Sequence, residues 1–265
     1  MNNLESALAY AQANRDTHLK QYRELLAIPS ISTLPAHQQD ILRNAEWLVA
    51  ALQELWMEGV TLMETPGHPV VYGESLKATG KPTVLVYGHY DVQPVDPLDE
   101  WVSDPFGAEI RDDYIFARGA SDMKGQLFAQ LKGLEALVRH GGCPVNIKYL
   151  FEGEEEIGSP NLERFIDENK ELLQCDFVLN CDSCINGVDV PSITYALRGL
   201  AYFEVHATAD VHHRQGERDA LARCLESGTN PSVITRAADE ALDAYWGLLD
   251  AVCEEAGVAD APAPA

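Results

Sequence analysis

Three short apolar segments, each followed at once by polar and acidic residues, constrain this chain most. They are PTVLVY at residues 82–87, VNIKYLF at 145–151 and DFVLN at 176–180. A continuous apolar run of this length is typical of a strand that is buried on both faces of a sheet. Helical patterns at residues 122–139 and 161–173 separate the three runs. Strands that alternate with helices predict an α/β fold, with a mostly parallel sheet and helices on both of its faces.

The two ends of the chain differ in character. Helical spacing of apolar residues predicts one long helix over residues 2–27 and a second over residues 38–57. We expect residues 1–208 to form the α/β portion of the molecule. We expect residues 209–265 to be an atypical segment with one helix, at 231–256, and a disordered Ala- and Pro-rich tail.

The charge of the chain excludes several classes of partner. The sequence has 19 Lys and Arg against 42 Asp and Glu, which gives a net charge of −23. Such a surface repels phosphate backbones and anionic lipids, so we expect neither nucleic acid nor membrane as a partner. No apolar run approaches the ~20 residues that span a bilayer, and we see no signal peptide. The six cysteines form no compact disulfide framework, so we expect reduced thiols in the cytoplasm.

Most of the residues that could bind a metal or act in catalysis come directly after the apolar runs. His89 and Asp91 follow the first, the acidic residues 152–156 follow the second, and Asp182 follows the third, while Asp122 precedes a helix. Each has an ordinary structural explanation, such as a loop-capping Asp, a helix N-cap at Asp122 or a solvated acidic turn. An open α/β sheet, however, places its ligands at the carboxyl ends of its strands. We therefore expect these side chains to meet at one edge of the sheet.

Several carboxylates with a single imidazole suit zinc, manganese or cobalt. Two such ions that share a carboxylate activate water and polarise a carbonyl, and a further carboxylate serves as the general base. The residues therefore indicate metal-dependent hydrolysis of an amide bond. The sequence has no G-x-S-x-G elbow, no P-loop and no G-x-G-x-x-G, which argues against serine hydrolases and nucleotide-binding proteins.

Longer segments carry a family resemblance. They are GHYDVQPVDPLDEWVSDPF, RGASDMKGQ, FEGEEEIGSPNL, NCDS and ITYALRGLAYFEV. In this order they resemble the M20 family of metallopeptidases, in particular its cytosolic dipeptidases, which include the carnosine and Cys-Gly dipeptidases. The resemblance implies a zinc-peptidase-like catalytic domain that hydrolyses dipeptides or short peptides with two Zn²⁺ ions, or with Mn²⁺ or Co²⁺ in their place.

The resemblance also implies a role for each site residue. It implies four metal ligands, His89, Asp122, Glu156 and Asp182. Asp122 would bridge the two ions, Asp91 would orient the imidazole, and Glu155 would be the general base. Glu154 falls outside this register and would have no catalytic role. His212 corresponds to a substrate-binding histidine of the family.

Family members are much longer than this chain. They insert a lid domain and then return to the catalytic domain with the last His ligand of the second zinc. The resemblance implies that this chain lacks both parts, so that the catalytic domain is incomplete, and His206, His212 and His213 are the candidate replacements. The alternative is an inactive, truncated metallopeptidase fragment that keeps one metal site and acts through binding. An acidic cation-buffering protein is a third class. The apolar face of the helix at 231–256 favours packing on its own domain, with a homodimer through this helix as the alternative.

Overall fold

The computed structural model describes residues 3–183 together with Gly187 and Val190. The predicted boundary at 208/209, the helix at 231–256 and the histidines of that region lie outside the described residues. In the part of the chain that the structure describes, every helix is too short or too polar to cross a lipid bilayer.

The centre of the fold is a five-stranded sheet with the order β1-β2-β6-β3-β7. Its strands are β1 (Glu58–Met63), β2 (Val70–Ser75), β3 (Thr83–His89), β6 (Asn146–Glu152) and β7 (Phe177–Asn180). Strand β3 pairs in parallel with both β6 and β7, whereas β2 runs antiparallel to β1 and to β6. All strands except β2 therefore share one direction, which confirms the prediction of a mostly parallel sheet.

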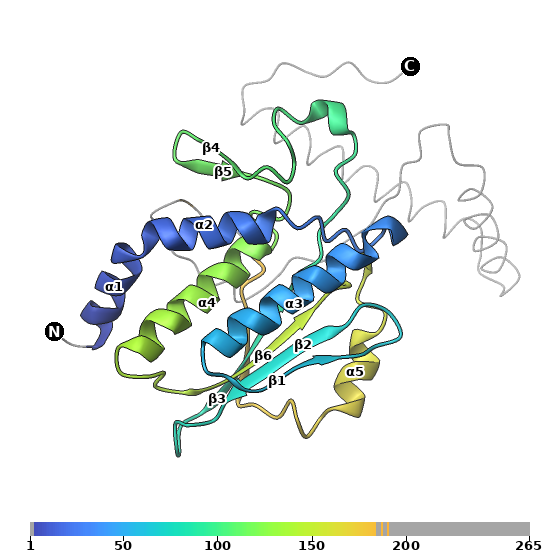
Figure 1. Ribbon diagram of the computed structural model, residues 1–265. Coiled ribbons are helices and arrows are strands. Elements are labelled where there is room, and N and C mark those ends of the chain that lie inside the picture. Colours follow the sequence, from blue (N-terminus) through green and yellow to red (C-terminus); the bar gives the residue numbers. More distant parts are fainter. Residues whose placement is uncertain (1–2, 184–186, 188–189, 191–265) are drawn as a thin grey trace, which may run out of the picture. The chain divides into compact units, whose positions relative to one another are not determined.

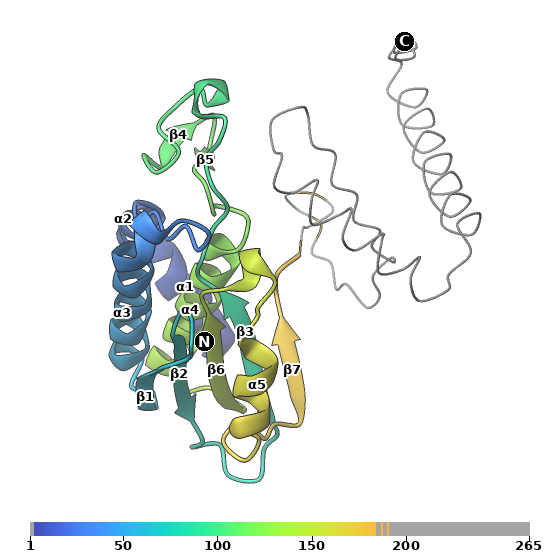
Figure 2. The same ribbon diagram turned by 90° about the vertical axis from the view of Figure 1, so that its right-hand side faces the viewer.

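Helices cover both faces of this sheet, as predicted (Figures 1 and 2). Those on one face are α1 (Asn3–Ala13), α2 (Arg15–Leu26), α3 (Gln38–Glu54) and α4 (Lys124–Arg139), and α5 (Leu162–Glu168) lies on the other. The side chains of β3 alternate between the two cores. Val84 and Val86 pack with α3 and α4, whereas Leu85 packs with Phe165 of α5.

The prediction of one helix over residues 2–27 is wrong. Helix α1 ends at Ala13, α2 begins at Arg15, and Asn14 between them leaves the helical conformation, with φ −103° and ψ 10°. The side chain of Asn14 donates a hydrogen bond to the carbonyl of Tyr10 at 2.9 Å. An Asn side chain that bonds to the local backbone in this way competes with the helix, and periodicity of apolar residues does not reveal this.

The prediction that the third apolar run is a buried strand is also wrong for the described residues. The exposed fractions of Phe177, Val178 and Leu179 in β7 are 52%, 58% and 44%. Strand β7 is the last strand of the described sheet and pairs on one side, with β3. An apolar run indicates that both faces of a strand are apolar, but it does not indicate whether another element covers them.

A hairpin that the sequence did not predict lies between β3 and α4. Strands β4 (Glu109–Arg111) and β5 (Tyr114–Phe116) pair antiparallel and are joined by Asp112 and Asp113, which have φ angles of 49° and 67°. Positive φ at both turn residues is what a two-residue hairpin loop requires. Three 3₁₀ turns complete the described elements, η1 (Pro35–His37), η2 (Leu98–Glu100) and η3 (Glu155–Ile157).

Candidate metal centre

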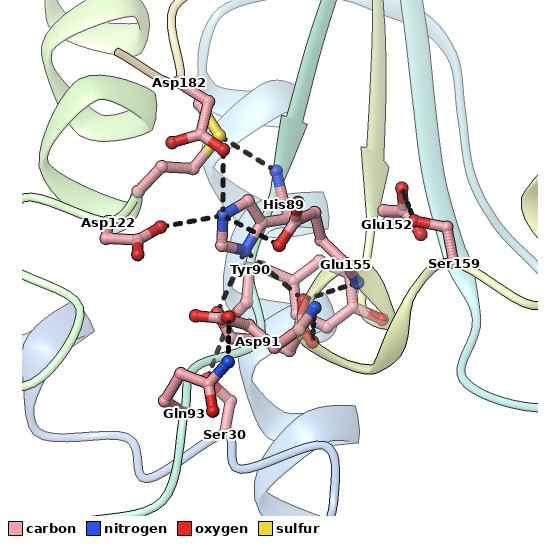
Figure 3. A network of polar contacts seen from close by, with 12 residues as sticks. Ser30, His89, Tyr90, Asp91, Gln93, Asp122, Glu152, Glu155, Ser159 and Asp182 are labelled. Atoms are coloured by element: carbon pink, nitrogen blue, oxygen red, sulfur yellow. Dashed lines mark hydrogen bonds and ion pairs between the residues drawn. The ribbon is translucent and has the colours of Figure 1, made fainter. Parts of the chain in front are cut away.

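The predicted site residues lie near the carboxyl ends of β3, β6 and β7 (Figure 3). His89 is the last residue of β3, and Asp91 follows two residues later. Glu155 begins η3 just beyond β6, and Asp182 lies two residues beyond β7. These strands are parallel, so their carboxyl ends meet at one edge of the sheet. This is the convergence that we expected from the sequence.

The imidazole of His89 is fully buried and lies at the centre of the cluster. Its Nε2 atom lies 3.2 Å from Asp122 Oδ1, 3.5 Å from Asp182 Oδ2 and 4.0 Å from Glu155 Oε2. Its Nδ1 atom lies 3.3 Å from Asp91 Oδ1 and 3.1 Å from the carbonyl oxygen of Asp91. Asp91 thus contacts one ring nitrogen, and the other nitrogen faces three carboxylates.

Asp91 also holds the acidic turn. Its two carboxylate oxygens accept hydrogen bonds from the backbone N–H groups of Glu155, at 3.2 Å, and Glu156, at 3.1 Å. The side chain of Asp91 is completely buried, so solvent does not compete for these bonds. One carboxylate therefore fixes both the imidazole of His89 and the backbone that carries the glutamate pair. The sequence motif shows only the proximity of Asp91 to His89, and we did not foresee this second contact.

Two groups of side chains bring potential ligand atoms within 4.8 Å of one another. The first is His89, Asp122 and Asp182, and the second is His89, Glu155 and Glu156. All three members of the first are among the four metal ligands that the resemblance implies. Among the described residues no group joins Asp122 to Glu156. An imidazole with carboxylate oxygens is a donor set that fits zinc and related divalent ions.

The protonation of the cluster reflects crowded negative charge. Burial alone would lower the pKa of His89, but the hydrogen bond to Asp91 and the charges of Asp91, Asp182 and Glu155 raise it to about 9. Burial raises the pKa of Glu155 above its ordinary value, and the carboxylates of Asp182, Asp91 and Asp122 raise it further. Burial likewise raises the pKa of Asp182. Carboxylates this close need a proton or a bound cation between them.

Two further residues support the site through contacts that the sequence did not indicate. Glu154 is buried, and its carboxylate accepts the backbone N–H of His68 at 2.9 Å and the side-chain amide of Asn161 at 2.9 and 3.1 Å. It therefore ties the connection between β1 and β2 to the acidic turn. Gln93 donates from Nε2 to Glu156 Oε2 at 2.5 Å. The only sequence signal for Gln93 is its place in the same motif as His89.

The chain is similar to known peptidases over most of its length. A family model described as peptidase family M20/M25/M40 matches residues 85–263, and thus extends past residue 208. A cysteinylglycine-S-conjugate dipeptidase of Corynebacterium striatum is 31% identical over 189 residues, which are 71% of this chain and 42% of that protein. A human Beta-Ala-His dipeptidase is 31% identical over 217 residues, covering 76% of this chain and 43% of that protein.

The fold agrees with these matches. The crystal structure of human carnosine dipeptidase 1 superposes with a TM-score of 0.65 and 30% identity, covering 69% of this chain and 42% of that one. The chain therefore spans less than half the length of these relatives. The family match, these relatives and the shared fold together establish that the chain belongs to peptidase family M20/M25/M40.

Proposed function

We propose that this protein is a metal-dependent hydrolase of dipeptides or other short peptides. The observation that carries the proposal is the buried imidazole of His89, which belongs to both groups of candidate ligands. The names of the relatives, which are dipeptidases, support the same class of substrate. Cys143, Cys175 and Cys181 are free thiols, and this supports the cytoplasmic setting that we include in the proposal.

We assign His89, Asp122 and Asp182 to one metal ion, the first group of candidate ligands, and Glu156 to a second ion. The family resemblance adds Asp122 as the ligand that the two ions would share. Zinc is the preferred ion, with manganese or cobalt as alternatives. When bound, such ions supply a polarising charge for a peptide carbonyl and lower the pKa of water. Asp91 would keep Nε2 of His89 directed at a metal ion, because the proton of Nδ1 faces the carbonyl oxygen of Asp91 at 3.1 Å and its carboxylate at 3.3 Å.

We assign the role of general base to Glu155. Its side chain is 38% exposed, so water and substrate reach its carboxylate. The raised pKa of Glu155 suits a group that takes a proton from water and returns it to the leaving amine. Its backbone is fixed through the hydrogen bond to Asp91. Substrate contact by His212 and formation of a homodimer stay predictions.

The decisive experiment is a hydrolysis assay with a panel of dipeptides, paired with elemental analysis of the purified chain. We expect turnover that depends on zinc, manganese or cobalt. Glu155→Gln should lower kcat by roughly 10²- to 10⁴-fold, the usual contribution of a general base, and should leave the metal content unchanged. Glu163→Gln, an exposed position on α5, is the matched control and should behave as the unmodified chain.

Two outcomes would contradict the proposal. Full activity of Glu155→Gln would remove Glu155 from the mechanism. One bound metal ion per chain without turnover on any dipeptide would reject hydrolysis and leave the inactive, metal-binding fragment as the explanation.

A further inference from the structure

The segment of residues 25–31, at the end of α2 and just beyond it, touches two of the loops that carry predicted metal ligands, the loop after β3 and the loop before α4. We call it the brace segment. Its residues Leu25, Leu26, Ile28, Ser30 and Ile31 are all buried. The sequence predicted only that a helix ends at residue 27, within this segment. None of its residues belongs to the candidate ligand groups, so its contacts with the site need a separate explanation.

The first contact holds the backbone carbonyl of Tyr90, the residue between His89 and Asp91. The hydroxyl of Ser30 donates to the carbonyl of Tyr90 at 2.7 Å (Figure 3). Asn44 of α3 donates from Nδ2 to the same carbonyl at 2.6 Å and to the Ser30 hydroxyl at 3.2 Å. All five of these residues have an exposed fraction of 0%. A carbonyl that accepts two buried hydrogen bonds has little freedom to rotate.

The same segment holds the far side of Asp91. The carbonyl of Ser30 accepts the backbone N–H of Val92 at 2.9 Å, and Ile31 forms an isolated parallel bridge with Val92. Asp91 is therefore anchored through the residue before it and the residue after it. Because Asp91 contacts Nδ1 of His89 and the backbone of Glu155, this anchoring extends to both sides of the site.

A third contact reaches the Asp122 loop. Lys124 lies two residues beyond Asp122 and is completely buried. Its Nζ donates to the carbonyl of Ile28 at 2.7 Å and to that of Leu25 at 3.3 Å. Met123, between Asp122 and Lys124, accepts the backbone N–H of His89 on its sulfur at 3.2 Å. The brace segment is thus joined to the loops on both sides of the imidazole.

We propose that Ser30 and Asn44 are positioning residues that set the geometry of His89 and Asp91 for metal binding. This inference rests on the proposed metal site. The competing explanation is that these hydrogen bonds only stabilise the fold. The Oδ1 atom of Asn44 has no hydrogen-bond partner among the described residues, so its contacts with Ser30 and Tyr90 are made by the amide donor. An apolar side chain of similar volume therefore removes the positioning contacts and leaves no other known contact broken.

The first test is metal affinity of the folded chain, measured by titration calorimetry with zinc. Ser30→Ala and Asn44→Leu should each weaken binding about 10-fold and the double variant up to about 100-fold, the range seen when groups that orient ligands are removed. Ser30→Thr keeps the hydroxyl and should restore affinity to within about twofold of the unmodified chain. Co²⁺ absorption spectra of the same variants should show altered coordination in the visible range.

The control separates positioning from stability. Leu52→Ala, on the same helix as Asn44 and completely buried, removes packing in the main core cluster and none of the hydrogen bonds of the brace segment. It should lower Tm at least as much as Ser30→Ala and leave the zinc Kd unchanged. Equal loss of affinity in Leu52→Ala, or affinity within twofold of the unmodified chain in the Ser30→Ala and Asn44→Leu double variant, would overturn the proposal.

A second readout does not depend on metal. In the metal-free chain, nitrogen NMR of the His89 ring should show one sharp pair of resonances, which broaden or split in the double variant but not in Leu52→Ala. Failure of the unmodified chain to bind any divalent ion would reject the proposed function, and this spectrum would still decide the role of the brace segment. An unchanged His89 spectrum in the double variant would count against that role.

Discussion

The imidazole of His89 lies among carboxylates that raise its pKa to about 9, although burial acts in the opposite direction. Among these carboxylates Asp91 differs from the others because it has no solvent exposure. It accepts N–H groups from the backbone of Glu155 and Glu156 as well as facing Nδ1 of His89. At the scale of single residues, Asp91 therefore couples the imidazole to the glutamate turn.

This coupling leads to a prediction for Asp91→Asn. The amide keeps the size of the side chain but loses the charge, and its NH₂ group does not accept a backbone N–H. We expect metal affinity to fall about 10- to 100-fold, as for other partners of metal-bound histidines. Zinc titration of the metal-free chain measures this loss.

Asp99→Asn, in the exposed turn η2, is the control for that change. Equal zinc affinity of the two variants would show that Asp91 does not orient the ligands.

The sequence indicated which side chains gather at this edge of the sheet, but not which contacts hold them there. His89, Asp122, Asp182 and Glu155 all follow strands or precede a helix, and the rule for open α/β sheets suffices to bring them together. The support from Ser30 was not predictable in the same way. Ser30 and Tyr90 are 60 residues apart in the chain, and no local pattern of residue types encodes a contact over that separation.

At the scale of elements, the layout of helices and strands followed from periodicity, whereas their ends and their exposure did not. Helix α1 ends just before Asn14, whose side chain and backbone N–H both donate to the carbonyl of Tyr10. Helix α1 then packs against α4, where Tyr10 donates to Glu135 at 2.6 Å. Lys132 and Arg139 of α4 contact the same carboxylate at 2.8 and 3.1 Å. Through Tyr10, this small network joins the two helices by a polar contact.

The network predicts how stability depends on pH. Burial alone would raise the pKa of Glu135, but hydrogen bonds from Lys132, Tyr10 and Arg139 lower it from 4.5 to about 2. Because the folded-state pKa is the lower one, the stabilisation is complete above pH 4.5 and is lost as the pH falls towards 2. We expect Glu135→Gln to reduce the free energy of unfolding at pH 7 by about 1–2 kcal/mol, allowing for solvent screening.

Urea unfolding at several pH values measures this contribution. The difference between Glu135→Gln and the unmodified chain should be constant from pH 7 to about pH 5 and should shrink below that. Glu168→Gln, which breaks an exposed ion pair with Arg164, should change stability little at any pH. A difference that grows on acidification would contradict the assignment of the low pKa to Glu135.

At the scale of the whole molecule, the candidate site is where separate parts of the described chain meet. His89 ends β3, Glu155 follows β6, Asp122 precedes α4, and Asp182 follows β7. Strand β7 pairs only with β3 in the described sheet and exposes its apolar side chains. A bound ion at His89, Asp122 and Asp182 would therefore join β7 to the rest of the sheet by a contact that the backbone pairing does not supply.

Removal of metal should then destabilise the chain in a specific place. An ion that binds only the folded state adds about 2.7 kcal/mol to the free energy of unfolding when its free concentration is 100 times its Kd. We expect Tm to fall after chelation and to recover as zinc is added back, in proportion to the logarithm of its free concentration. Hydrogen exchange of backbone amides should show the largest loss of protection in β7, because its other attachment is the single pairing with β3. In His89→Ala, which removes the ligand common to both groups, chelation should leave Tm and exchange unchanged. If chelation lowers Tm equally in His89→Ala, the ion that stabilises the chain is bound elsewhere, and the junction at the sheet edge is not its site.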